Sequence, residues 1–282
     1  MKVQILGTAA ATAMPLPFCN CRVCKESRKR GGKSFRKRSA ALINDELLID
    51  LSPDLCSMAY IHHIDLGKIR YLLQTHSHSD HFDAGHFVTR SSSYATQSLI
   101  HLDIICSRGT CDDMNHWIKE NESDMDIYDL HWQKDMNFDL HLIRAGETLC
   151  IGPYSITALD SMHDERVEAL IYLIEYEGKN ILYGTDLKTI NMRTWEILKN
   201  RKLDLVILDQ TYGEGFNAGG HLDAGQVVSI IGKMRELAII NERTQIYATH
   251  ISHEGNDVHE TMEQLANKNG YHIAYDGCTF LL

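Results

Sequence analysis

Long hydrophobic runs are missing from this sequence, because no stretch approaches the roughly 18 consecutive apolar residues that a membrane-spanning helix needs. Residues 2–6, at the N-terminus, have the composition of a β-strand rather than that of a signal peptide. We therefore expect a cytoplasmic protein with no cleaved signal and no membrane partner.

The sequence also lacks any sign of a domain boundary. Proline is scarce, with four residues in 282, and there is no linker rich in Pro or Ser, no low-complexity tract and no repeat of fixed period. A chain of this length with 44% hydrophobic residues can bury a large core. We predict a single domain that spans residues 1–282.

Positive charge is in deficit, with 28 Lys and Arg residues against 38 Asp and Glu residues and a net charge of −10. This balance disfavours a protein whose whole surface binds a nucleic acid backbone, although it leaves room for a local basic patch. Residues 25–38 form such a run, with eight Lys and Arg residues around Gly31 and Gly32. The run could hold a phosphate-bearing substrate, but a solvated loop is the simpler interpretation.

Eight cysteines in a chain this long do not indicate a disulfide scaffold, and without export the thiols should stay reduced. Five of them are scattered and are interpreted as ordinary small buried residues: Cys56, Cys106, Cys111, Cys150 and Cys278. The other three, Cys19, Cys21 and Cys24, are close enough to share one tetrahedral zinc ion.

Short β-type runs alternate with helical patterns along the chain. Strands are expected at 2–6, 40–43, 47–51, 70–75, 154–159, 169–176, 180–183, 205–209 and 245–249, and helices at 223–240 and 256–269. Turns at 44–45 and 177–178 join neighbouring strands, so the sheets should be mixed or antiparallel with the helices outside them. The pattern predicts an α/β protein, a four-layer αββα sandwich. The weakly periodic segment 101–141 is expected to be a lid over the site or a plain surface insertion.

The strongest functional signal is the run Thr75-His76-Ser77-His78-Ser79-Asp80-His81, which directly follows a predicted strand. Four ligand-type side chains within six residues, on a loop that leaves a strand, can point at a common centre. Neutral imidazoles and one carboxylate suit zinc, manganese or iron. A polar His-rich turn is the alternative, but further candidate ligands at later strand ends argue against it.

This run resembles the signature of the metallo-β-lactamase superfamily, H-x-H-x-D-H after a strand, followed by separate His, Asp and His ligands. The later ligands are matched by His163, Asp186 and His250, and Asp50 matches an early aspartate that supports the metal loop. The resemblance implies the metallo-β-lactamase fold, with one metal ion on His76, His78 and His163, a second on Asp80, His81 and His250, and Asp186 bridging them. It also implies that a bridging hydroxide is available near neutral pH and that the metal pair offsets charge on a phosphoryl oxygen.

A fourth ligand for the cysteine cluster is offered by His253, three residues after His250 in Thr249-His250-Ile251-Ser252-His253. The C-x-C-x-x-C run together with this loop resembles the PhnP-type phosphodiesterases that accompany bacterial carbon–phosphorus lyase. That resemblance implies a structural zinc in a knuckle near residues 19–24, held by Cys19, Cys21, Cys24 and His253. Three free buried thiols are the alternative.

The segment Gly220-His221-Leu222-Asp223 resembles the site of a histidine near the leaving group in this family and in ribonuclease Z. The resemblance implies that His221 delivers a proton to the departing alkoxide, and it assigns Asp80 to the catalytic group as well. His221 could equally be a helix-entry residue, because Asp223 is a candidate N-cap. Residues 82–86 depart from the glycine-containing run of the subfamily, which leaves the substrate open.

The sequence therefore predicts a binuclear metal-dependent hydrolase, a phosphodiesterase for a small cyclic or nucleotide-like phosphodiester. Its expected cofactors are two divalent ions, which could be zinc, manganese or iron, and one structural zinc. A nuclease like ribonuclease Z is the second interpretation; the basic run favours it and the net charge opposes it, so a nucleic acid partner is disfavoured. A metal-bound carrier like the PQQ-biosynthesis member ranks last, because it would have fewer catalytic metal ligands. A homodimer is left open.

Overall fold

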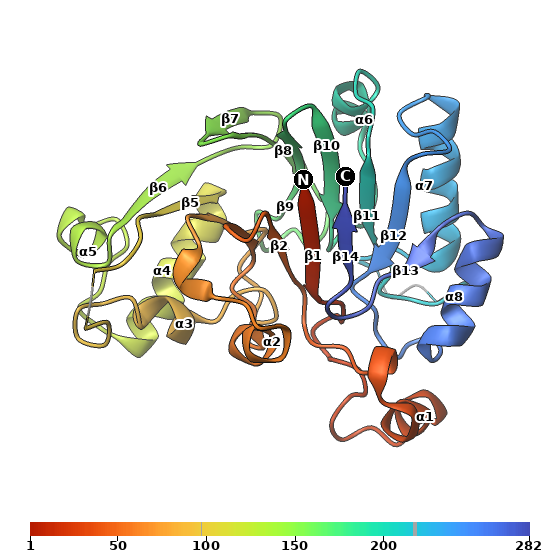
Figure 1. The fold of residues 1–282 in the computed structure, drawn as a ribbon, viewed down its shortest axis with the longest axis horizontal. Coiled ribbons are helices and arrows are strands. Elements are labelled where there is room, and N and C mark those ends of the chain that lie inside the picture. The colour runs from red at the N-terminus through yellow and green to blue at the C-terminus, as the bar shows by residue number, and fades with distance from the viewer. Residues whose placement is uncertain (97, 217–218) are drawn as a thin grey trace.

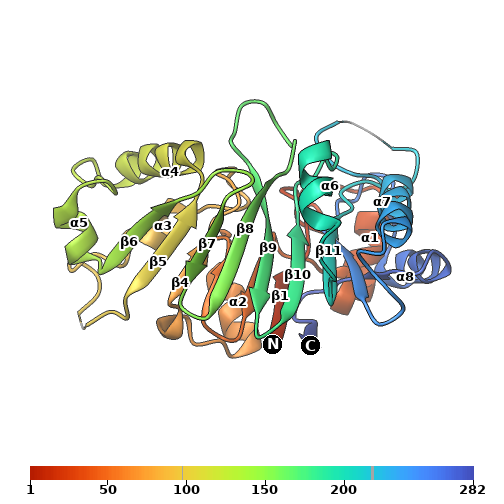
Figure 2. The ribbon, with the colours of Figure 1, turned by 90° about the horizontal axis from the view of Figure 1, so that it is seen from above.

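Two β-sheets with helices on their outer faces make up the computed structural model, which describes residues 1–96, 98–216 and 219–282 (Figures 1 and 2). The first sheet has seven strands in the order β14-β1-β2-β3-β4-β5-β6. These strands are β1 (Lys2–Gly7), β2 (Ala40–Ile43), β3 (Leu47–Ile49), β4 (Tyr71–Leu73), β5 (Leu102–Cys106), β6 (Phe138–Leu142) and β14 (Thr279–Leu281). Neighbours are parallel from β3 to β6 and antiparallel elsewhere.

The second sheet also has seven strands, in the order β13-β12-β11-β10-β9-β8-β7. These strands are β7 (Thr148–Ile151), β8 (Tyr154–Asp160), β9 (Leu170–Tyr176), β10 (Lys179–Gly184), β11 (Leu205–Asp209), β12 (Gln245–Thr249) and β13 (His272–Ile273). Neighbours are antiparallel from β7 to β10 and parallel from β10 to β13. Both sheets are therefore mixed, as predicted.

The helices cover the outer faces of the sheets and complete the four layers. They are α1 (Arg22–Arg30), α2 (Leu55–His62), α3 (Ala84–Val88), α4 (Arg108–Asn121), α5 (Leu130–Asp135), α6 (Met192–Leu198), α7 (Ala224–Glu236) and α8 (His259–Lys268), with short 3-10 turns η1 (Gly32–Ser34) and η2 (Leu66–Lys68). Helices α2, α3 and α4 pack on the first sheet, and α6, α7 and α8 pack on the second. The structure confirms the predicted αββα sandwich. No helix in the described part of the chain is long and apolar enough to cross a membrane.

The alternation of side chains along each strand explains why two sheets stack. In β11, Leu205 and Ile207 face the apolar layer between the sheets, whereas Val206 and Leu208 face the helices. The first four residues of this strand are buried and all apolar, and the buried Asp209 ends it. The same alternation in β1 places Val3 and Ile5 in the layer between the sheets.

Several local signals act as predicted. Glu177 and Gly178 join β9 to β10 with φ values of 49° and 76°, which suit the twist of a two-residue hairpin loop. Asp223 is the N-cap of α7 and forms a capping box with Gln226. Helix α7 ends at Glu236, four residues before the predicted end, because Ala238 has a φ of 53°, outside the helical region.

Two expectations about segments are wrong, and two of the cysteines expected to be buried, Cys56 and Cys150, are exposed. The segment 101–141 is neither a lid nor a surface insertion, because it supplies β5 and β6 of the first sheet together with α4 and α5. The basic run 25–38 is not a solvated loop either, because most of it lies in α1 and η1. Within that run Arg36 is buried and donates hydrogen bonds to Thr8 Oγ1 and to the carbonyl oxygen of Ala274.

Candidate metal centre

The predicted ligands lie on loops that leave the carboxyl ends of four strands. The loop after β4 carries His76, His78, Asp80 and His81; His163 follows β8, Asp186 follows β10 and His250 follows β12. Strands β10, β11 and β12 are parallel neighbours, so their carboxyl ends meet at one edge of the second sheet. The fold thus gathers side chains that are up to 174 positions apart in the sequence.

The ligand-type atoms form two groups of three whose atoms all lie within 4.8 Å of one another. One group is His76, His78 and His163, and the other is Asp80, His81 and His250. Asp186 lies between them, with Oδ1 3.8 Å from His76 Nε2 and 3.5 Å from His163 Nε2. Its Oδ2 lies 2.9 Å from His81 Nε2 and 3.2 Å from His250 Nε2. Asp186 therefore has one oxygen toward each group.

The ring nitrogens of the cluster converge on one another, as ligands of a metal ion do. His163 Nε2 faces His78 Nδ1 at 3.3 Å, and His81 Nε2 faces His250 Nε2 at 3.4 Å. His76 Nε2 is buried and has no hydrogen-bond partner among the described residues. Burial opposes the charge on Asp186, but His250 and His81 hold its pKa well below the usual range, so it is a carboxylate. Converging lone pairs and a buried carboxylate are the chemistry of a metal site.

Most of these imidazoles are oriented through their other ring nitrogen. His81 Nδ1 lies 2.6 Å from Asp50 Oδ2, His76 Nδ1 lies 3.0 Å from Thr75 Oγ1, and His163 Nδ1 lies 2.7 Å from the carbonyl oxygen of Gly220. His250 Nδ1 lies 2.8 Å from Thr211 Oγ1. Such contacts set which nitrogen points into a metal centre.

Asp50 is the anchor of the histidine loop. It is fully buried and accepts hydrogen bonds from the backbone N–H and the hydroxyl of Thr75. Gln74, which is also buried, donates to Asp50 and to the carbonyl oxygens of His76 and His81. The early aspartate thus lies where the resemblance implies, whereas no sequence signal indicated Gln74.

The backbone at the site adopts a conformation that side chains rarely tolerate. Asp50, Met162, Asp186 and His250 have φ values of 67°, 56°, 52° and 60°. Non-glycine residues at such angles cost free energy, and they cluster at functional sites. Two of the four are predicted metal ligands, and a third precedes His163.

His221 lies beside the candidate metal ligands and is paired with the carboxylate of Asp209. Its Nδ1 is 2.9 Å from Asp209 Oδ2, and its ring stacks on that of His250 with centroids 5.1 Å apart. Burial disfavours a charged imidazole, but Asp209 outweighs this effect and raises the pKa of His221 to about 9. With Nδ1 held by Asp209, Nε2 is the nitrogen left for a ligand.

Asp209 was not among the residues predicted from the sequence, although it ends β11 much as Asp186 follows β10. It is fully buried and also contacts the hydroxyl of Thr211, which in turn holds His250. An acidic residue at the end of a strand between two ligand-bearing strands was the signal that could have identified it.

A cavity of about 320 Å³ opens over the centre. Its lining includes the metal-type residues His78, Asp80, His163, Asp186 and His250, together with His221, Arg166, Glu254 and residues 10–12. None of residues 25–38, all of which the structure describes, is among the lining residues. The basic run therefore does not hold a substrate inside this cavity.

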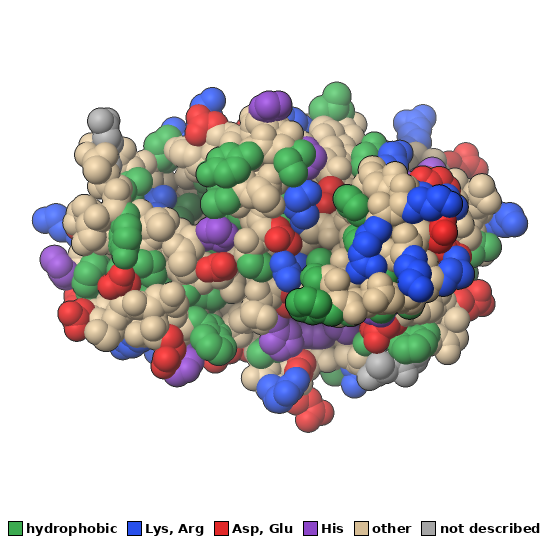
Figure 3. Space-filling model, turned by 90° about the horizontal axis from the view of Figure 1, so that it is seen from below, with side chains coloured by type: hydrophobic (Ala, Val, Ile, Leu, Met, Phe, Trp, Pro, Cys, Tyr) green, Lys and Arg blue, Asp and Glu red, His purple; other side chains and the backbone are tan. Residues whose placement is uncertain are grey.

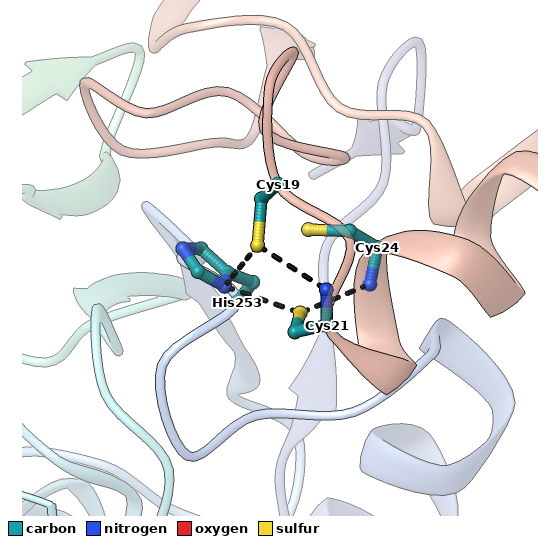
Figure 4. Close-up of side chains that lie close together, drawn as sticks. All are labelled: Cys19, Cys21, Cys24 and His253. Carbon is teal, nitrogen blue, oxygen red and sulfur yellow. Dashed lines mark hydrogen bonds between the residues drawn. The ribbon is translucent and has the colours of Figure 1, made fainter.

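The three cysteines and His253 form a separate cluster at the start of α1 (Figure 4). His253 Nδ1 lies 3.5 Å from Cys21 Sγ and 3.9 Å from Cys19 Sγ. Burial opposes a thiolate at Cys21, but the backbone N–H of Cys24 and the contact with His253 lower its pKa to about 6. Burial raises the pKa of Cys24 to about 12. Three sulfur atoms and one imidazole nitrogen within 4.8 Å are a fitting donor set for one zinc ion.

The chain is similar to known proteins in both sequence and fold. A model of the β-lactamase superfamily domain matches residues 46–251. The fold is similar to that of a diphosphatase from the PhnP family, with 20% identity, a TM-score of 0.73 and coverage of 100% of this chain and 97% of the other. Zinc-bound PqqB from Methylobacterium extorquens has 20% identity and a TM-score of 0.74, with both chains covered completely. At such identities the likeness establishes the fold alone.

Two further proteins are similar to the chain, one in its fold and one in part of its sequence. The short form of human tRNase Z has 15% identity and a TM-score of 0.66, with coverage of 100% of this chain and 99% of the other. An octanoyltransferase from Porphyromonas gingivalis is 38% identical over 84 residues. These residues are 29% of this chain and 16% of that protein, so the chain spans only a small part of this curated relative.

Proposed function

The chain belongs to the β-lactamase superfamily, and from this premise we propose that it is a binuclear metal-dependent phosphodiesterase. Its substrate in this proposal is a small cyclic or nucleotide-like phosphodiester. The observation that carries the proposal is the sharing of Asp186 between two sets of three ligand-type side chains, beside the paired His221 and Asp209.

The donor set suits two divalent ions, which could be zinc, manganese or iron. The first would be held by His76, His78 and His163, the second by Asp80, His81 and His250, and Asp186 would contact both. Such a pair, when bound, lowers the pKa of a water molecule and offsets negative charge on a phosphoryl oxygen.

The residues of the chain supply positioning and a proton. Asp50 and Thr211 hold the imidazoles of His81 and His250 so that Nε2 of each faces Asp186. Asp209 holds His221 Nδ1, so that Nε2 can donate a proton to the departing alkoxide of a diester. A phosphodiester needs this help because an alkoxide leaves poorly without a proton. The pairing of His221 with an acid therefore favours diester hydrolysis.

A metal-bound carrier remains the weaker candidate, despite the similarity of the fold to PqqB. A carrier has no use for an acid-paired histidine in the cavity, nor for two complete ligand sets. The similarity to a PhnP-family diphosphatase and to tRNase Z supports chemistry at phosphate, but it does not choose between a small diester and RNA.

Elemental analysis of the purified protein together with a diester screen tests the proposal. We expect three metal ions per chain, turnover of bis(p-nitrophenyl) phosphate and of nucleoside cyclic phosphates, and loss of turnover with a chelator. The matched control is Asp80→Ala, purified in the same way. Full metal content with no turnover of any diester would contradict the proposal, and cleavage of short RNA alone would favour the nuclease.

A further inference from the structure

Positive charge is concentrated in one part of this acidic protein, which we call the basic knuckle and define as residues 15–38. The knuckle contains nine of the 28 Lys and Arg residues and one of the 38 Asp and Glu residues, so it carries +8 while the rest of the chain carries −18. Figure 1 shows that α1, which forms much of the knuckle, projects beyond the two sheets. The net charge of the knuckle is therefore opposite in sign to that of the rest of the chain.

Helix α1 separates its buried and basic residues onto two faces. Val23, Cys24 and Ser27 are buried, whereas Lys25 and Lys29 lie one turn apart on the exposed face. Arg28, Lys29 and Arg30 occupy the last turn, where the helix dipole favours positive charge. The buried face holds the helix in place and leaves Lys25 and Lys29 on the surface.

Some of the cations already have partners inside the protein. Arg22 pairs with Asp257, Arg30 pairs with Glu26 and Glu260, and Lys37 and Arg38 pair with Asp276 and Asp54. Arg36 is buried. By contrast, Lys25, Arg28, Lys29 and Lys33 have no carboxylate within 4.0 Å in the described part of the chain. Arg28 donates hydrogen bonds to the carbonyl oxygens of Leu16 and Pro17, and Lys33 Nζ lies 3.9 Å from the centroid of the Tyr275 ring. All four cations are exposed, and none has its charge neutralised by a paired carboxylate among the described residues.

The knuckle also contains two exposed aromatic side chains. Phe18, just before the cysteine cluster, is 100% exposed, and Phe35 after η1 is 44% exposed. A fully exposed phenyl ring gains nothing from folding. Figure 3 shows Lys and Arg side chains gathered on one side of the face seen from below, with hydrophobic and His side chains next to them.

The chain places the knuckle near the metal centre at two points. Residues 10–12 line the cavity, and Phe18 follows six positions later. His253 contacts Cys21. It is three residues from His250, so the Cα atoms of His250 and His253 are at most about 11 Å apart. A ligand on the knuckle would therefore lie close to the cavity.

We propose that the basic knuckle binds the backbone of a single-stranded nucleic acid, with phosphates on Lys25, Arg28, Lys29 and Lys33 and an unpaired base on Phe18. Lysine and arginine side chains neutralise successive phosphates, and an exposed aromatic ring stacks on a base only where that base is unpaired. The acidic body repels the rest of the strand, which confines binding to this surface. This binding does not rest on the proposed hydrolysis, so either can fail alone.

The test is fluorescence anisotropy of a labelled oligouridylate with Asp80→Ala, whose catalytic site should be inactive. With four phosphate contacts on a single strand, the logarithm of the binding constant should fall with the logarithm of salt concentration with a slope of about −3. The double variant Lys25→Glu/Lys29→Glu should bind at least about tenfold more weakly and halve that slope. Phe18→Ala should weaken binding about tenfold without changing the slope.

The control is Lys134→Glu/Lys233→Glu, which makes the same change in net charge at two exposed helical lysines of α5 and α7. It should bind as Asp80→Ala does. Zinc content and Tm show whether each variant is folded. Equal losses in the two double variants would overturn the proposal, because only net charge would then matter. Binding to phosphatidylserine vesicles but not to the oligonucleotide, or dissociation of a dimer as the only effect of the knuckle variant, would overturn it too.

Discussion

At the residue scale, hydrogen bonds orient most of the imidazoles of the candidate metal centre. Four of its five imidazoles have a partner at the nitrogen that faces away from the cluster: His76, His81, His163 and His250. His78 is the exception; its Nδ1 faces His163, and its Nε2 lies 3.8 Å from Asp164. Because the other four rings are held in place, the ligand loops should keep their positions when one ligand is removed.

Replacing Asp80 by Ala should abolish diester hydrolysis while the fold remains. Asp80 contributes one of three donors to the second group and sits on a loop above an independently packed core. We expect the rate to fall by roughly a thousandfold or more, because in the proposed mechanism the metal pair would supply most of the chemistry. Initial rates, metal content and Tm measure the effect. Asp139→Ala, on the exposed side of β6, is the control and should keep full activity; normal turnover in Asp80→Ala would rule out the ligand assignment.

His221→Ala should distinguish substrates by their leaving groups. Because Nδ1 is held by Asp209, Nε2 can protonate a departing alkoxide, and an activated nitrophenolate needs no proton. We expect a loss of about a hundredfold or more with alkyl diesters and less than about tenfold with bis(p-nitrophenyl) phosphate. Asp209→Asn should show the same pattern in milder form. Equal losses on both kinds of substrate would count against the proton-donor role.

At the element scale, the loops after β11 and β12 must approach each other closely. The first contains Thr211 and the second contains His250 and His253, so their contact links the two candidate metal sites. At the point of closest approach, a Cβ atom on Gly213 would overlap the backbone carbonyl group of Gly255. Only glycine fits there without a shift of one loop.

Gly213→Ala should therefore destabilise the protein and disturb the second metal group. We expect a loss of about 2 kcal/mol, as for other overpacked positions, and a Tm lower by about 5 °C. Gly232→Ala is the matched control: Gly232 lies in α7, and apart from the neighbouring helix backbone no described residue comes within 4 Å of an added Cβ. That substitution should stabilise the helix by about 0.5 to 1 kcal/mol. Thermal unfolding of both variants measures these changes. An unchanged Tm in Gly213→Ala would show that the loops can move apart.

At the scale of the whole molecule, the cysteine cluster connects distant parts of the chain. Cys21 and His253 are 232 positions apart and lie beside each other at 3.5 Å. A zinc ion held there would tie the segment before α1 to the loop that carries His250. Such a cross-link would stabilise the folded state and would also fix His250, a proposed metal ligand.

Cys21→Ser should lower the zinc content by one ion per chain and the Tm by roughly 10 °C or more. Activity should fall with stability, because His250 would lose its support. Cys278 is buried between the sheets, so Cys278→Ser would itself disturb the packing. Cys150 is exposed, and Cys150→Ser is therefore the control; it should change neither the zinc content nor the Tm. Unchanged zinc content and Tm in Cys21→Ser would show that the cysteines do not form a metal site.

The sequence by itself determined the features that depend on local pattern. Strands β2, β11 and β12 begin and end where their apolar runs predicted, and Asp223 caps α7. The order of the candidate ligands along the chain, and their place at strand ends, was also readable. These features follow from side-chain alternation and capping, which involve only residues near one another in the sequence.

Only the tertiary structure decided the features that depend on distant partners. The segment 101–141 became β5 and β6 because β4 offers an edge with which to pair, which its weak periodicity did not reveal. Arg36 belongs to the basic run, but it is buried and donates hydrogen bonds to Thr8 Oγ1 and to the carbonyl oxygen of Ala274. Asp209 became part of the site because His221 packs against it. In each case the stabilising contact lies outside the local segment, so local propensity could not identify it.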